Sequence, residues 1–332
     1  MKESAHAVDR AAGQPEATPR QASSISRSLE YRDKWEARGS IRTRPRKPID
    51  FAREGYFFPK EKQPLLLNEA ASKLGQDSTN TLLIHSFFKY LNDIINLEIK
   101  FIVSACEKII YGKLPLSYPD TLKLNAYTVI IDEYYHVYIA KDMTLQLKQR
   151  FPELRELNYP LSDSYRSIIE TKALLDEKYH DIFEILAVCI FETTLVRELV
   201  EFFNSDNIHP SIKYYINDHM NDESRHYGFF LDLMKYTWEN LPEEYRAAIG
   251  THLAFFVKRY LNIESDKDFN TQLLGQFTGD NNAAERIGVI YKGFDITPDI
   301  PIVKNVLTAL RNSGVANHPS VRSSFNNIGW QI

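Results

Sequence analysis

The sequence predicts an all-α protein that folds as a helical bundle, and three observations lead to this prediction. Stretches with apolar residues at helical spacing fill the chain from about residue 80 onward. Segments that contain proline separate these stretches, and the sequence has no run of alternating strands and no glycine-rich phosphate loop. Only 13 glycines occur among 332 residues, which is few for an open α/β fold.

The periodic stretches predict four long helices followed by shorter ones. We expect the long helices near 80–112, 120–149, 179–204 and 210–237, and shorter ones near 242–261, 280–292 and 301–313. Prolines mark the boundaries because proline interrupts the interior of a helix. Residues 41–320 should therefore form a single bundle domain with additional C-terminal helices, and 321–332 a tail.

The first 40 residues differ from the rest of the chain in composition. They are polar, with scattered serines, prolines and glutamines and alternating charges, so they have little apolar surface to bury. We expect this arm to be disordered, at least in part. The basic run Arg42–Lys47 that follows is either a solvated segment or a docking patch for an acidic partner.

Composition also narrows the class of protein. The net charge of −4 argues against a nucleic-acid binder, which is usually basic. The sequence contains no uninterrupted apolar stretch of about 20 residues, so we expect no membrane span. The N-terminus lacks the apolar core of a signal peptide. Cys106 and Cys189 lie in apolar helical patterns and should be buried free thiols, so we expect a cytoplasmic protein without a cysteine metal site.

Two copies of one local motif give the strongest indication of chemistry. Asp132-Glu133-Tyr134-Tyr135-His136 and Asp222-Glu223-Ser224-Arg225-His226 both read D-E-x-x-H. Residues three apart share one face of a helix, so each copy directs a carboxylate and an imidazole at one point. Two such pairs and one glutamate from each of two other helices form the recurring di-iron site of four-helix bundles. A single E-x-x-H, by contrast, is usually a surface pair.

This arrangement requires two further glutamates inside apolar stripes. Glu98 and Glu192 satisfy the requirement, because apolar residues surround each of them on its own helix face. An unpaired carboxylate in such a place would be costly to bury, and a metal removes that cost. Glu107 has polar neighbours and should lie at the surface, and Glu198 is a weaker candidate than Glu192.

A third histidine extends the second motif. His219 lies four residues before Glu223 and seven before His226, so all three share one helix face. Carboxylates with imidazoles and no thiolate suit Fe(II) or Mn(II). Glu133 and Glu223 are the expected bridging ligands, and Asp132 and Asp222 are expected to accept the second N–H of ligand histidines. The predicted metal ligands are Glu98, Glu133, His136, Glu192, His219, Glu223 and His226.

At these residues the chain resembles the diiron N-oxygenases typified by p-aminobenzoate N-oxygenase. The resemblance covers Tyr90 to Phe230 and is weaker, but visible, from Trp35 to Tyr56. The pattern of a first Glu, D-E-x-x-H, a third Glu and H-x-x-x-E-x-x-H is present in full, and His219 is its most specific mark. Tyr90 matches a tyrosine position of the family's substrate pocket.

The resemblance implies a ferritin-like fold, two iron ions, O2 as co-substrate, and oxidation of an amine nitrogen to the hydroxylamine, nitroso or nitro level. It also suggests a homodimer and a biosynthetic pathway. Because no flavin or nicotinamide motif is visible, electrons should come from a separate reductase or ferredoxin. Carbon oxidation by the same metals, iron handling and a purely structural role are the alternatives.

The substrate pocket is less well defined by the sequence. A family pocket for an aminobenzoate needs a cation for the carboxylate, and no arginine here matches that position clearly. An aromatic amine, an amino acid or another aliphatic amine are all possible substrates. The candidate cations are Arg197, Arg286, Lys304 and Arg311, and the tyrosines expected to line or support the cavity are Tyr90, Tyr134, Tyr135, Tyr138 and Tyr227.

Overall fold

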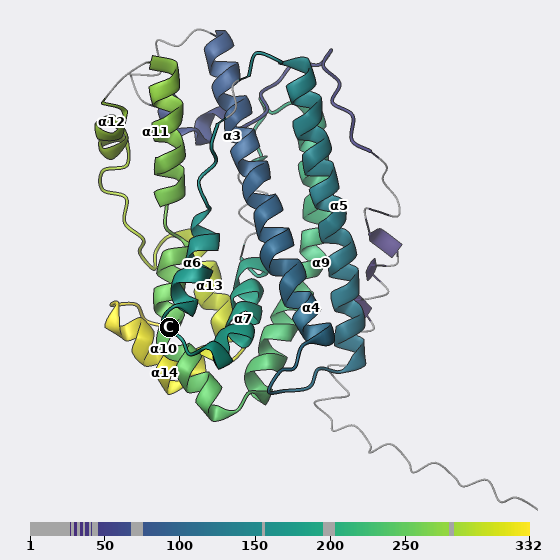
Figure 1. The fold of residues 1–332 in the computed structure, drawn as a ribbon, viewed down its shortest axis with the longest axis vertical. Helices are drawn as coiled ribbons and strands as arrows, with labels where there is room; N and C mark the ends of the chain where they lie inside the picture. Colours follow the sequence, from purple (N-terminus) through teal and green to yellow (C-terminus); the bar gives the residue numbers. More distant parts are fainter. Residues whose placement is uncertain are drawn as a thin grey trace, which may run out of the picture.

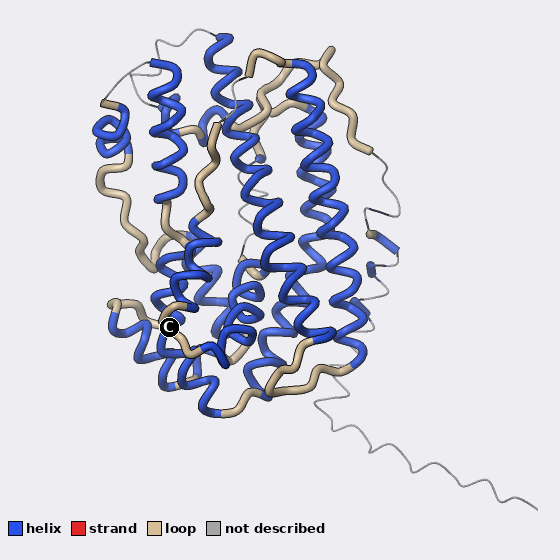
Figure 2. Tube along the Cα trace, viewed as in Figure 1, coloured by secondary structure: helices blue, strands red, loops and turns tan. Residues whose placement is uncertain are grey.

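The computed structural model describes residues 46–67, 76–154, 157–194, 203–278 and 282–332, together with residues 27, 30, 31, 34, 35, 37–39 and 41. Helices and loops account for the described residues, apart from one isolated bridge between Tyr56 and Ile208 (Figure 2). Within these residues, no helix combines the length and the hydropathy needed to cross a membrane. The predicted all-α class is confirmed.

Long helices running alongside one another form the body of the molecule (Figure 1). Helix α5 contacts α3, α4 and α9, and helix α7 contacts α4 and α9. A π-helical turn, η3, joins α3 to α4 without a break. The bounds of these elements are α3 (Gln76–Leu97), η3 (Glu98–Ile102), α4 (Val103–Tyr111), α5 (Asp120–Arg150), α7 (His180–Glu192) and α9 (Pro210–Asn240).

Further helices cover one side and one end of this body (Figure 1). They are α6 (Asp163–Lys172), α10 (Glu243–Tyr260), α11 (Glu264–Thr278), α12 (Ala283–Ile290), α13 (Pro301–Asn312) and α14 (Pro319–Asn327). Helices α10 and α14 pack closely because Gly250 has no side chain. A Cβ at this position would collide with Ser320 Oγ and crowd Val321.

Several sequence expectations need correction. Helices α6 and α11 were not expected, because polar residues interrupt the apolar periodicity of both segments in the sequence. The helix expected over 179–204 ends at Glu192, and residues 195–202 lie outside the described residues. The expected C-terminal tail is instead packed, because Val321, Phe325 and Trp330 are buried. Those side chains supply the apolar surface that holds α14 against α10.

The described residues of the N-terminal arm include two buried aromatic side chains. Tyr31 and Trp35 are buried, although their segment was expected to be disordered in part. The basic run that follows forms ion pairs where it is described: Arg46 with Asp142, and Lys47 with Asp218. The side chain of Lys47 is buried. Lys47 therefore fits neither the solvated segment nor the docking patch that were the alternatives for this run.

The buried apolar residues form two clusters, and the polar centre lies between them. On α5, Val129 belongs to one cluster and Ile139 to the other. On α9, Phe229 and Ile216 are divided in the same way. On both helices the D-E-x-x-H motif lies between the residues of the two clusters. Apolar side chains therefore flank the charged groups on both sides along the helix.

Candidate metal centre

The structure brings all seven predicted ligand residues together. Helix α9 supplies three of them, α5 two, and the π turn η3 and the last residue of α7 one each. Every one is buried, with 6% or less of its surface exposed. The residues are Glu98, Glu133, His136, Glu192, His219, Glu223 and His226.

One group of four offers donor atoms that all lie within 4.8 Å of one another: Glu98, His136, His219 and Glu223. His219 Nε2 lies 3.3 Å from Glu98 Oε1 and 3.0 Å from Glu223 Oε1. His136 Nδ1 lies 3.6 Å from each of the same two oxygens. These two imidazoles and two carboxylates surround one position suited to a cation.

A second group, by the same criterion, contains Glu133, Glu192, Glu223 and His226. His226 Nδ1 lies 3.1 Å from Glu133 Oε1, 3.5 Å from Glu223 Oε2 and 3.7 Å from Glu192 Oε2. Glu223 belongs to both groups. Glu133 also spans them, since its other oxygen, Oε2, lies 3.2 Å from His136 Nδ1. The geometry is that of two adjacent cation positions joined by Glu133 and Glu223.

The π turn η3 begins at Glu98, and no sequence pattern predicted it. Helix α3 ends directly before η3 and helix α4 begins directly after it, so no loop interrupts the helical backbone. Single π turns inside α-helices occur frequently at functional sites because they shift the register of one helix face relative to the next. Here the change of register falls at the residue whose carboxylate faces His136 and His219.

The two aspartates of the motifs contact histidines on the opposite helix. Asp222 Oδ2 of α9 lies 3.2 Å from His136 Nε2 of α5, and Asp132 Oδ2 of α5 lies 3.4 Å from His226 Nε2 of α9. Both histidines therefore present Nδ1 to the glutamates and Nε2 to an aspartate. Arg225 lies between the two aspartates and pairs with both. Such outer contacts fix the tautomer and orientation of a ligand histidine.

The charges within this centre act strongly on one another. Burial raises the pKa of Glu192 well above its ordinary value, and the negative charges of Glu223 and Glu133 raise it further. Burial and the charge of Glu133 also raise the pKa of Glu98. Although burial opposes protonation of His226, the charge of Glu223 helps to raise its pKa well above the ordinary value. The four carboxylates thus require positive charge at the centre.

Metal ions fit this requirement better than protons do. Glu98 Oε2, Glu133 Oε1, Glu192 Oε2 and His226 Nδ1 are buried and make no hydrogen bond to any residue that the structure describes. Buried polar atoms without hydrogen bonds are rare in proteins and call for an explanation such as a bound ion. Divalent cations would satisfy these atoms and displace protons from the histidines. Buried carboxylates and imidazoles without thiolates are donors that Fe(II) accepts.

The tyrosines expected around the cavity divide into two sets. Tyr134, Tyr138 and Tyr227 are exposed and point away from the centre, which corrects that expectation. Tyr135 and Tyr90 lie nearer to it. Tyr135 lines a small gap together with His136 and His219. Burial raises the pKa of Tyr90 well above its ordinary value, and the charges of Glu98 and Glu223 contribute. The Tyr90 hydroxyl is therefore within electrostatic reach of the centre.

Three of the four cations considered for a substrate carboxylate do not lie at the centre. Arg286, Lys304 and Arg311 are exposed on α12 and α13. Arg197 lies outside the described residues. Glu107 is exposed as expected, and Cys106 and Cys189 are buried free thiols as expected.

Other residues of the centre were missed by sequence reasoning. Tyr215 is buried with its ring 6.0 Å from that of His219, and its position four residues earlier on the same helix was a usable signal. Arg225 lies inside the second motif, but its role between two aspartates depends on tertiary structure. Trp35 donates a hydrogen bond to Asp132 across 97 positions of sequence, and no local pattern indicates it.

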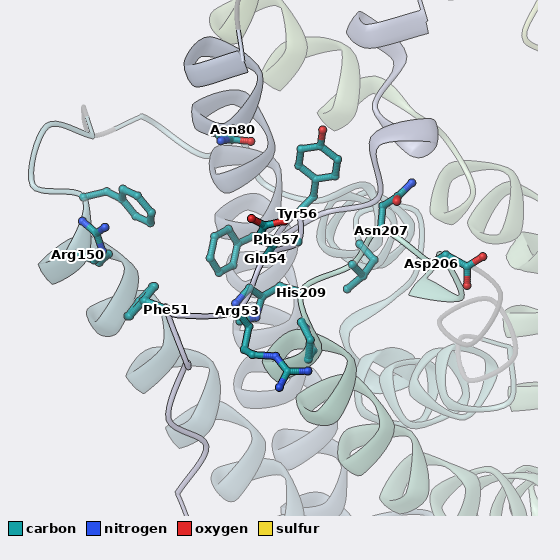
Figure 3. A pocket seen from close by; sticks show the side chains of 14 residues that line it. Phe51, Arg53, Glu54, Tyr56, Phe57, Asn80, Arg150, Asp206, Asn207 and His209 are labelled. Atoms are coloured by element: carbon teal, nitrogen blue, oxygen red, sulfur yellow. The ribbon is translucent and has the colours of Figure 1, made fainter.

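A cavity of about 630 Å³ lies elsewhere in the molecule. It forms where the segment around Phe51–Phe57 meets the end of α5 and the start of α9 (Figure 3). Phe51, Arg53, Arg150 and His209 are among the side chains around it (Figure 3). None of the seven ligand residues lines this cavity, so it is separate from the metal centre.

The fold and the centre together define a class: helical-bundle proteins with a buried carboxylate and histidine site for two cations. Comparison with known families then identifies the family. The chain matches the family described as p-aminobenzoate N-oxygenase AurF over residues 43–285 and belongs to it. This is a ferritin-like diiron family, so the predicted family and fold are confirmed. A search of curated proteins gives no match.

Proposed function

We propose that this protein is a non-haem diiron oxygenase that oxidises the amine nitrogen of a small molecule. The observation that carries the proposal is the pair of four-residue groups that share Glu223 in a member of this family. Each group contains at least one imidazole and at least two carboxylates, a donor set that suits Fe(II).

The geometry supports a specific assignment of the ligands. Glu98, His136 and His219 would hold one iron, and Glu192 and His226 the other. Glu133 and Glu223 would bridge the two, because their oxygens face imidazoles of both groups. The third histidine, His219, gives one iron position two imidazole ligands, whereas the other position has one.

When bound, the two irons supply the reduction of O2 and the transfer of one of its oxygen atoms to nitrogen. In the first oxidation, an amine R–NH2 becomes R–NHOH, and the second oxygen atom leaves as water. This balance needs two electrons and two protons for each O2. An external reductase or ferredoxin is the proposed donor, because the sequence contains no flavin or nicotinamide motif.

The protein residues around the centre exclude water and admit the amine. The two apolar clusters close the centre from both ends of the bundle. A cavity of about 250 Å³ lies beside α3 and α11, with Tyr90 in its wall. We propose that the amine enters there, because Tyr90 lines this cavity and the charges of Glu98 and Glu223 contribute to the raised pKa of its hydroxyl. Its lining mixes Phe58 and Phe269 with the polar Ser86, Lys89 and Asn270.

The test loads the full-length protein with Fe(II), reduces it, and adds isotopically labelled O2 with aromatic and aliphatic amines. The expected products carry labelled oxygen on nitrogen, as detected by mass spectrometry. Glu223→Ala should abolish both iron binding and product, whereas Glu107→Ala, a change at an exposed glutamate, should affect neither. Products oxidised only at carbon would overturn the nitrogen assignment, and a wild-type protein that binds no iron would overturn the diiron proposal. Light scattering tests the homodimer, which rests on the resemblance alone.

A further inference from the structure

The described part of the N-terminal arm lies against α5 and α9, beside the metal centre. The ring of Tyr31 packs 5.5 Å from that of Phe229 on α9. Further along, the Arg46 guanidinium donates two hydrogen bonds of 3.0 Å to the Asp142 carboxylate of α5. Gln146 accepts a hydrogen bond from the Ile49 N–H at 2.7 Å. The arm and the segment that follows it are thus held by specific contacts on both sides of Trp35.

Trp35 connects this arm to the centre through Asp132. Its indole Nε1–H donates to Asp132 Oδ2 at 2.8 Å, and both residues are buried. The same oxygen lies 3.3 Å from Arg225 Nη2 and 3.4 Å from His226 Nε2. Asp132 Oδ1 has no hydrogen-bond partner among the described residues. Oδ2 therefore receives the contacts of Trp35, Arg225 and His226, and the indole helps to set which way the carboxylate faces.

The two histidine–aspartate pairs are supported differently. Asp222, which contacts His136, pairs with Arg225 one turn later on the same helix. Asp132, which contacts His226, also depends on a donor from a segment outside the bundle. The half of the centre with His226 is thus coupled to the arm through the contact between Trp35 and Asp132.

We propose that Trp35 is a positioning residue of the metal centre: its indole N–H orients the Asp132 carboxylate, which in turn orients His226. The inference rests on the proposed diiron function. Trp35 lies outside residues 43–285, so the family match does not imply its contact. Removing an outer partner of a ligand histidine typically lowers metal affinity about 10–100-fold. Trp35 acts one contact further out, through Asp132, so its removal should give a loss at the lower end of this range. The loss should fall on the iron bound by His226 and Glu192.

The experiment is an anaerobic Fe(II) titration of the full chain with Trp35→Phe, which keeps an aromatic ring and removes the N–H. Wild type should bind two irons. In the variant, one iron should bind as before and the other about tenfold more weakly. Mössbauer spectra should show one of the two iron signals broadened or shifted. The matched control is Trp238→Phe, a buried tryptophan on α9 about 18 Å along the helix from His226.

A second variant separates positioning from loosening of the arm. Arg46→Ala removes the two hydrogen bonds to Asp142 without touching Asp132. Weakening in Trp35→Phe alone supports the proposal. Isotherms and spectra of Trp35→Phe that match wild type overturn it, as does equal weakening in Trp35→Phe and Arg46→Ala. Absence of iron from the wild type would instead refute the proposed function.

Discussion

Replacing Arg225 by Met gives a direct measure of the electrostatics of the centre. The guanidinium is 6% exposed and pairs with Asp132 and Asp222, both of which are fully buried. Methionine preserves most of the side-chain volume and removes the charge. The variant leaves two buried carboxylates without their shared cation. We therefore expect the iron-free protein to lose stability.

The size of this loss follows from the burial of the pair. Breaking a buried ion pair by removing one partner costs about 3–5 kcal/mol. For a chain of 332 residues, the average unfolding entropy per residue converts this loss into a decrease of roughly 4–7 °C in melting temperature. Protonation of His136 and His226, whose pKa values are raised, offsets part of the loss in the iron-free protein.

Calorimetry of the iron-free variant is the assay, with Arg246→Met as the control. Arg246 pairs with the exposed Glu243, and an exposed pair of this kind contributes about 1 kcal/mol or less. Adding Asp222→Asn to Arg225→Met should restore part of the stability, because one unpaired charge is removed. If Arg225→Met and Arg246→Met melt at the same temperature, the reasoning about the buried cation is wrong.

Three further predictions concern iron binding, packing and pH. Glu223→Ala should lose both irons, whereas Glu192→Ala should retain one; equal iron content in the two variants, by elemental analysis, would contradict the shared role of Glu223. Gly250→Ala should destabilise the protein by about 1–3 kcal/mol in denaturant unfolding, because the new methyl group meets Ser320; unchanged stability would show that α14 shifts freely. Burial lowers the pKa of His85 from 6.5 to about 4, so the unfolded chain takes up its proton first. The part of the folding stability that depends on a neutral His85 is therefore complete above pH 6.5 and is lost as the pH falls towards 4. Replacing His85 by Phe should flatten the dependence of stability on pH in that interval, and an unchanged slope would count against the assignment.

Much of the centre could be predicted from sequence because its ligands obey helix periodicity. Glu133 and His136 are three residues apart, and His219, Glu223 and His226 follow the same face of α9. Charged residues on an otherwise apolar stripe stand out in a sequence, as Glu98 and Glu192 did. The helices that carry the motifs were also predicted within a few residues, since α5 and α9 are bounded by prolines.

Interactions between distant segments could not be read in this way. The exposure of Tyr134, Tyr138 and Tyr227 depends on which face of each helix meets a neighbour, and the motif alone does not specify it. The π turn at Glu98 is a change of register within a continuous helix, and its residues have ordinary helical composition.

The sequence by itself determined the class of fold, the motifs and which carboxylates and imidazoles share a helix face, because these follow from contacts three or four residues apart. Tertiary structure alone decided that Asp132 contacts His226 and Asp222 contacts His136, and that Trp35 reaches Asp132. Such pairings arise when packing of the apolar clusters sets the spacing of α5, α9 and the arm. Their partners are far apart in the chain, so no periodic pattern records them.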